Sequence, residues 1–144
     1  MIEKDSIRLL RECDAGVKMG IASIEDVEPY ASAAGLKAAL TNCKEEHQRL
    51  GREIENELKR FHDDGKDPNP IAKGMSHLKT EVKLVMNESD GTIADLMTDG
   101  CNMGVKSLNK YLNEYKAADE HSKDIAKKLI KLEEKLSKDI HGYL

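Results

Sequence analysis

Apolar side chains recur every three to four residues along most of the chain, which is the period of an amphipathic helix. The stripe is clearest between residues 36 and 61, where its members are Leu36, Leu40, Cys43, His47, Leu50, Ile54, Leu58 and Phe61. The alternation typical of strands is not sustained over any stretch of the sequence. The pattern therefore predicts an all-α protein whose helices each bury one face.

Prolines, glycines and capping residues divide this pattern into five helices. Pro29 ends the first helix, since the residue before a proline avoids helical geometry. Asn69 followed by Pro70 is typical of a helix start, with asparagine as the N-cap and proline in the first turn. We predict helices over residues 5–27, 30–62, 70–88, 91–116 and 119–141, within a single domain spanning residues 1–144.

The boundary at Ala117–Asp119 is marked by neither glycine nor proline. A single helix from Thr92 to Gly142 would be about 75 Å long at 1.5 Å per residue, which is too long for a compact domain of this size. We therefore place a break there, with Asp119 or Ser122 as the cap. One continuous coiled-coil arm is the alternative.

The order of long and short helices predicts the topology. Two long helices come first and two come last, and the short helix at 70–88 would return the chain along the bundle between them. This is a four-helix bundle with a helical crossover. Glycines spaced four apart, at Gly16 and Gly20 and at Gly100 and Gly104, are expected where two backbones approach closely.

Composition and charge narrow the classes of function. Apolar residues make up 39% of the 144 residues, charged residues 35%, and the net charge is −4 with acids and bases interspersed. We therefore expect no nucleic-acid partner, because phosphate binding requires a concentrated basic surface. The Lys-rich stretch at 127–138, interleaved with Glu133 and Glu134, is interpreted as a solvated helix face, with a target-binding or membrane-surface helix as the alternative.

Location follows from what the sequence lacks. No run approaches the roughly 18 apolar residues of a spanning helix, so we expect no membrane insertion. The first residues contain no apolar segment typical of a signal peptide. Cys13, Cys43 and Cys101 are odd in number and far apart, which favours reduced thiols in the cytoplasm.

The arrangement resembles the ferritin-like superfamily, whose members join two helix hairpins through a long crossover. Within it, the chain is similar to small stand-alone bacterial bundles of unassigned function. The resemblance rests on Asp14 followed by small and apolar residues, the long polar helix ending at Phe61-His62, the segment 74–79 and the helix from Ile93 to Tyr115.

The departure from this superfamily concerns the metal ligands. Its di-iron members use Asp/Glu-x-x-His pairs, in which a carboxylate precedes a histidine by three residues. The residues at that position before the five histidines of this chain are Lys44, Lys59, Gly74, Ala118 and Lys138. The resemblance thus implies the fold and argues against di-iron oxidation chemistry.

Two polar residues, Asp14 and His47, interrupt the apolar stripes and require partners if buried. With the first turn centred at residues 28–29, Asp14 is expected opposite Cys43, one turn from His47, and Cys101 near Cys43. These four side chains are a candidate metal site, for zinc or iron, in which Cys13 could substitute for Asp14. A satisfied polar core pair with buried, inert cysteines is the alternative.

Three functions follow from these features. The first is a non-catalytic bundle acting through its surface, as a homodimer or with another protein. The second is a metal- or small-ligand-binding bundle that uses the Asp14, His47 and cysteine cluster. The third is a residual ferritin-like oxidoreductase with non-standard ligands.

Overall fold

The computed structural model describes residues 2–68 and 89–144, and these residues form helices and no strands. The long helices are α1 (Ile2–Val27), α2 (Ala34–Arg60), α4 (Asp90–Glu114) and α5 (Glu120–Ile140). Two 3₁₀ turns, η1 (Glu28–Tyr30) and η2 (His141–Tyr143), follow α1 and α5. The all-α prediction is confirmed, whereas the predicted helix at 70–88 lies outside the described residues.

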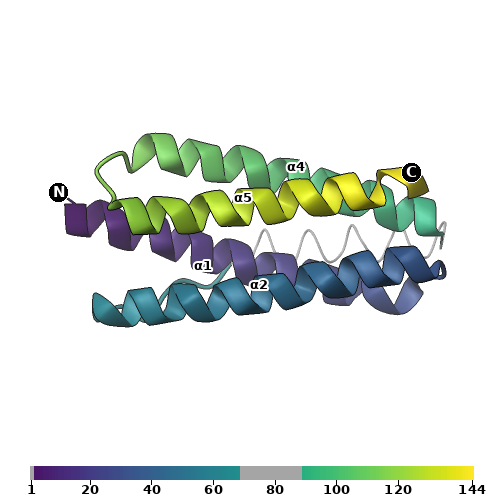
Figure 1. Cartoon of the computed structure of the whole chain (residues 1–144), viewed down its shortest axis with the longest axis horizontal. Coiled ribbons are helices and arrows are strands. Elements are labelled where there is room, and N and C mark those ends of the chain that lie inside the picture. The colour runs from purple at the N-terminus through teal and green to yellow at the C-terminus, as the bar shows by residue number, and fades with distance from the viewer. Residues whose placement is uncertain (1, 69–88) are drawn as a thin grey trace.

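The four helices form a bundle in which α1 and α5 run in one direction and α2 and α4 run in the other (Figure 1). Helix α1 contacts α2, α4 and α5, and α5 also contacts α2 and α4. The starts of α2 and α4 lie together, because the Asp90 carboxylate accepts the backbone N–H groups of Ser32 at 2.8 Å and Ala33 at 3.0 Å. A ferritin-like relationship and a crossover helix stay predictions.

The connection between α1 and α2 sets how these two helices are aligned. Helix α2 begins at Ala34, not at residue 30, because η1 and the residues up to Ala33 form the connection. As a result Gly20 lies against His47, and Gly51 lies against Val17. The expectation that Asp14 faces Cys43 is therefore wrong, since it assumed a tighter turn.

The break between α4 and α5 is confirmed. Helix α4 ends at Glu114, and α5 begins at Glu120 after the cap residue Asp119. The Asp119 carboxylate accepts the N–H of Ser122 at 2.7 Å, and the Asp119 N–H donates to Ser6 Oγ at 2.8 Å. The continuous coiled-coil arm is thereby excluded.

After α2 the chain turns and runs back along α1. Gly65 has a φ of +89°, a left-handed conformation that favours glycine. The next N–H, from Lys66, donates to Asp14 Oδ2 at 2.9 Å, and Lys18 lies 3.1 Å from Asp67 Oδ1. Residues 65–67 are thus tied to consecutive turns of α1.

The buried apolar residues form two clusters, one toward each end of the bundle. The first contains Leu9, Leu10, Cys13, Val17, Leu50, Ile54, Leu58, Leu108, Ala118, Ile125, Ala126 and Leu129. The second contains Ile24, Val27, Ala31, Leu36, Leu40, Cys43, Ile93, Met97, Cys101, Leu136 and Ile140. Between the two clusters, four residues lie against one another, one from each long helix: Gly20, His47, Gly104 and Glu133. We call these four residues the polar layer.

Candidate functional site

The polar layer takes one residue from each helix of the bundle, and its two charged members face each other. His47 on α2 is 1% exposed, and the side chain of Glu133 on α5 is 13% exposed. A Cβ atom on Gly20 would lie 2.8 Å from the His47 ring, and one on Gly104 would lie 3.4 Å from Glu133 Oε2. The two glycines therefore leave the volume that the imidazole and the carboxylate occupy.

Both ring nitrogens of His47 are engaged. Nε2 lies 2.8 Å from Glu133 Oε1, and Nδ1 lies 2.8 Å from the backbone oxygen of Cys43 and 3.4 Å from its Sγ. Burial alone would lower the pKa of His47, but hydrogen bonds to Cys43 and Glu133 outweigh it and raise this pKa to about 10. The ring is therefore an imidazolium at neutral pH and donates both protons.

Cys101 on α4 extends this arrangement toward the surface. Its side chain is buried, and its thiol interacts with the Glu133 carboxylate. Burial and then the negative charge of Glu133 raise the pKa of the Cys101 thiol far above its ordinary value. The thiol stays neutral, so it can donate a hydrogen bond but lacks the thiolate that nucleophilic chemistry requires.

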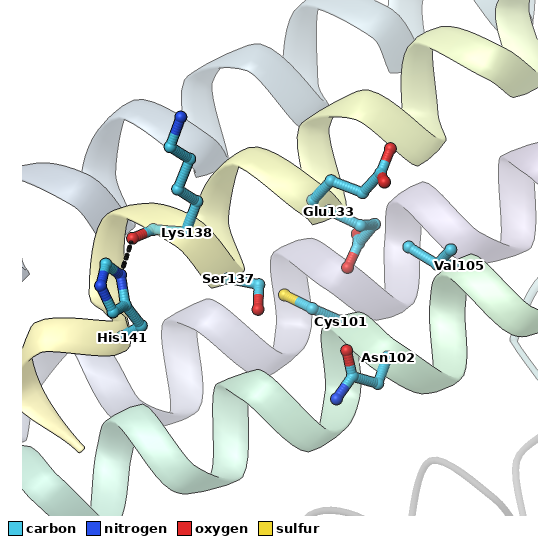
Figure 2. Close-up of a pocket in the computed structure, with 8 residues that line it drawn as sticks. Cys101, Asn102, Val105, Glu133, Ser137, Lys138 and His141 are labelled. Carbon is cyan, nitrogen blue, oxygen red and sulfur yellow. Dashed lines mark hydrogen bonds between the residues drawn. The ribbon is translucent and has the colours of Figure 1, made fainter.

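A cavity of about 500 Å³ opens between α4 and α5 beside this thiol, with lining residues Cys101, Asn102, Val105, Glu133, Glu134, Ser137, Lys138 and His141. Figure 2 shows the side chains of Cys101 on α4 and Ser137 on α5 pointing toward each other. His141 lies at one end of the group, where its Nδ1 is 2.5 Å from the backbone oxygen of Lys138. The volume is within the range of small-molecule sites.

Asp14 does not join this group. Its carboxylate accepts the N–H of Lys66 and forms an ion pair with Lys18 at 2.9 Å. It precedes Gly20, the α1 residue beside His47, by six positions, or about 9 Å along the helix. Asp14 therefore holds the segment after α2 and is no ligand of the predicted cluster.

Of the other predicted metal ligands, His47 and Cys101 interact with Glu133, and Cys43 lies against Nδ1 of His47. Their arrangement does not fit a bound metal ion, because both nitrogens of His47 donate hydrogen bonds and offer no lone pair. Over residues 2–68 and 89–144, no group of three or more His, Cys, Asp or Glu side chains is placed to hold a metal ion.

Glu133 is the residue of this candidate site that the sequence interpretation did not include. The lysine-rich stretch predicts a solvated face for it, whereas its side chain is only 13% exposed and faces His47. The signal was the spacing of four and three residues through the buried positions, which runs Ser122, Ala126, Leu129, Glu133, Leu136, Ile140. A carboxylate on such a stripe requires a partner, and His47 is the buried cation that the bundle supplies.

Comparisons with known proteins leave the chain without an assigned family. No protein-family model matches it, and neither curated proteins nor solved structures give a significant match. Within the described part of the chain, no helix has the length and apolar character needed to cross a membrane.

Proposed function

We propose that this chain is a binding protein that takes a small polar molecule in the cavity between α4 and α5. The observation that carries the proposal is the position of the Glu133 carboxylate. One oxygen, Oε1, is hydrogen-bonded to His47 in the interior, Oε2 lies toward Gly104 on α4, and Glu133 itself lines the cavity. A fixed, partly exposed carboxylate at the inner end of a cavity is a recognition group.

The energetic cost of burying the His47–Glu133 pair supports a role for this pair beyond packing. Removing an imidazolium and a carboxylate from water is costly, and apolar residues of similar volume are often as stabilising or more so. The bundle nevertheless has this pair at its centre, and two helices carry glycine to accommodate it. We infer that the pair fixes the orientation of the Glu133 carboxylate toward the cavity.

Binding is favoured over catalysis by the protonation states of the same groups. His47 is charged and donates from both nitrogens, so it cannot accept a proton at neutral pH. Cys101 is a neutral thiol and a poor nucleophile. Neither group is prepared to act as a general base or a nucleophile.

A fragment screen by ¹H–¹⁵N NMR tests the proposal. Small polar molecules that bind should shift the amides of residues 101–105 and 133–138, which flank the cavity. The matched control is Asn102→Trp, since Asn102 is exposed at the rim and an indole there fills the cavity without disturbing the core. Hits that shift other regions, or that bind the Asn102→Trp variant equally well, would contradict the proposal.

The bundle acting through its surface, as a homodimer or with a protein partner, is the competing hypothesis. It predicts that no small molecule moves the amides around the cavity. It also predicts that the wild-type chain self-associates in sizing chromatography combined with light scattering, or that it binds a protein partner. This pair of results would favour the surface function.

Zinc or iron binding by Cys43, His47 and Cys101 is an alternative hypothesis with its own test. It requires His47 to lose a proton and leave Glu133, which the hydrogen bonds oppose. Elemental analysis of protein purified without an affinity tag or added metal is the measurement. We expect no stoichiometric metal, and a full equivalent that disappears in His47→Ala would overturn this expectation.

A further inference from the structure

We infer that the ligand of the cavity between α4 and α5 carries an ammonium group, which binds the Oε2 atom of Glu133. This inference rests on the proposed binding function and specifies the charge of the ligand. It follows from how charge is distributed over the described residues that line the cavity, from the inner end to the rim.

The inner end combines one carboxylate with neutral groups. Around Glu133 the lining residues are Cys101, Val105 and Ser137, which are uncharged when the thiol is protonated. A carboxylate offers about four acceptor positions, and His47 occupies one of them, on Oε1. The thiol of Cys101 interacts with the same carboxylate, which still leaves acceptor positions on the cavity side.

The basic residues lie farther out. Lys138 and His141 are exposed, and His141 lies in η2, beyond the end of α5 at Ile140, which is about 10 Å along the helix from Glu133. Glu134, also exposed, adds a second negative charge at the rim. A ligand anion at the inner end would therefore meet a carboxylate with no lining cation beside it.

The imidazolium of His47 does not reverse this preference. It lies on the core side of the carboxylate and is 1% exposed, so a ligand reaches it only across Glu133. An ammonium on Oε2 adds charge-assisted hydrogen bonds, and the hydroxyl of Ser137 and the amide of Asn102 supply neutral acceptors nearby. The expected order of affinity is ammonium, then neutral hydroxyl, then carboxylate.

Three probes of one shape test this order on the intact wild-type chain: cyclohexylammonium, cyclohexanol and cyclohexanecarboxylate at pH 7. Each is titrated while the amides of residues 101–105 and 133–138 are followed by NMR. We expect the ammonium compound to bind at these residues about tenfold tighter than the alcohol, the usual advantage of a charged over a neutral hydrogen bond, and the carboxylate to bind most weakly.

Two variants locate the effect. Glu133→Gln should abolish the preference for the ammonium compound, whereas Glu134→Gln, which removes a neighbouring carboxylate at the rim, should retain most of it. Because Glu133→Gln leaves His47 without its ion-pair partner, a His47→Leu/Glu133→Leu double variant provides a second test that buries no unpaired charge.

The outcomes separate the two claims. If the alcohol or the carboxylate binds these residues as tightly as the ammonium compound, the inference about charge is overturned and the binding function stands. If none of the three probes shifts the cavity amides, both are overturned. A preference that persists in Glu133→Gln and in the double variant would also overturn the inference.

Discussion

His47 and Glu133 show how a single residue pair can decide the chemistry at the centre of a bundle. The 2.8 Å bond between them joins α2 to α5, and the second nitrogen of His47 is anchored to the backbone of its own helix at Cys43. Each charge is tolerable in the core only because the other is present. Removing one partner and removing both should therefore have opposite consequences.

We expect His47→Leu and Glu133→Leu, taken singly, each to lower the free energy of unfolding by roughly 3–5 kcal/mol, the usual cost of leaving a buried charge without its partner. The double variant should equal the wild type or exceed it by up to about 4 kcal/mol, as replaced buried ion pairs often do. Urea denaturation of the four proteins measures this cycle. Additive losses in the double variant would show that the two side chains are independent.

The same pair predicts a pH dependence. The pKa of His47 is raised from an ordinary 6.5 to about 10, so the folded state binds one more proton than the unfolded state between these values. The contribution of the pair to stability is full below pH 6.5 and is lost as the pH rises through about 10. NMR titration of the His47 ring gives the pKa directly.

The control for this pH effect is the His47→Leu/Glu133→Leu variant, in which other groups titrate as before. The free energy of unfolding of the wild type, minus that of the variant, should fall between pH 6.5 and pH 10. A difference that stays constant over this range would mean that His47 is not charged in the folded protein.

At the scale of the helices, the glycines of α1 and α4 have different surroundings despite their similar spacing. A Cβ atom on Gly20 would meet the His47 ring at 2.8 Å, whereas one on Gly100 has nothing within 4 Å. Spacing alone cannot distinguish these cases, because helix period reports which face a residue occupies and not what packs against it.

The same substitution at these two glycines should therefore act in opposite directions. Gly20→Ala forces the His47 ring to move and should destabilise the protein by about 1–3 kcal/mol. Gly100→Ala adds only helix propensity and should stabilise it by up to about 1 kcal/mol. Thermal and urea unfolding measure both. Equal effects at the two positions would contradict the proposed fit of His47 against Gly20.

The sequence predicted the features that depend on local pattern. The break between α4 and α5, with Asp119 as one of two predicted caps, and the proximity of Cys101 to Cys43 followed from period and helix length. Local pattern could not supply the alignment of α1 with α2, since the residues between Glu28 and Ala33 form a longer connection than the proline suggests. Asp14 was misplaced for that reason.

Glu133 was missed for a different physical reason. It lies in a stretch dense in lysine, where charge is normally solvated, and neighbouring Leu132 offered an alternative stripe. In the structure both residues are partly buried, and the Glu133 carboxylate faces His47. The density of charged residues around Glu133 favoured a solvated position, whereas the helical spacing of the neighbouring buried residues indicated the inward-facing position that the structure has.

At the scale of the whole molecule, the polar layer lies between two apolar clusters, and α1, α2, α4 and α5 each contribute residues to both clusters. Different hydrogen bonds connect the helices at the two ends of the bundle. Ser6 and Asp119 bond at one end, and Asp90 holds the start of α2 at the other. Each cluster therefore lies beside its own set of hydrogen bonds between helix ends.

Because the buried apolar residues form two separate clusters, we expect two cooperative units of different local stability. Native-state hydrogen exchange measures the free energy of opening at each amide. The core amides should fall into two groups with different values, and the boundary between the groups should lie near residues 20, 47, 104 and 133. Filling the layer with leucine at positions 47 and 133 would make the apolar interior continuous and merge the two values. These two results together would identify the imidazolium–carboxylate pair of the wild type as the boundary at which one half of the protein can open while the other remains folded.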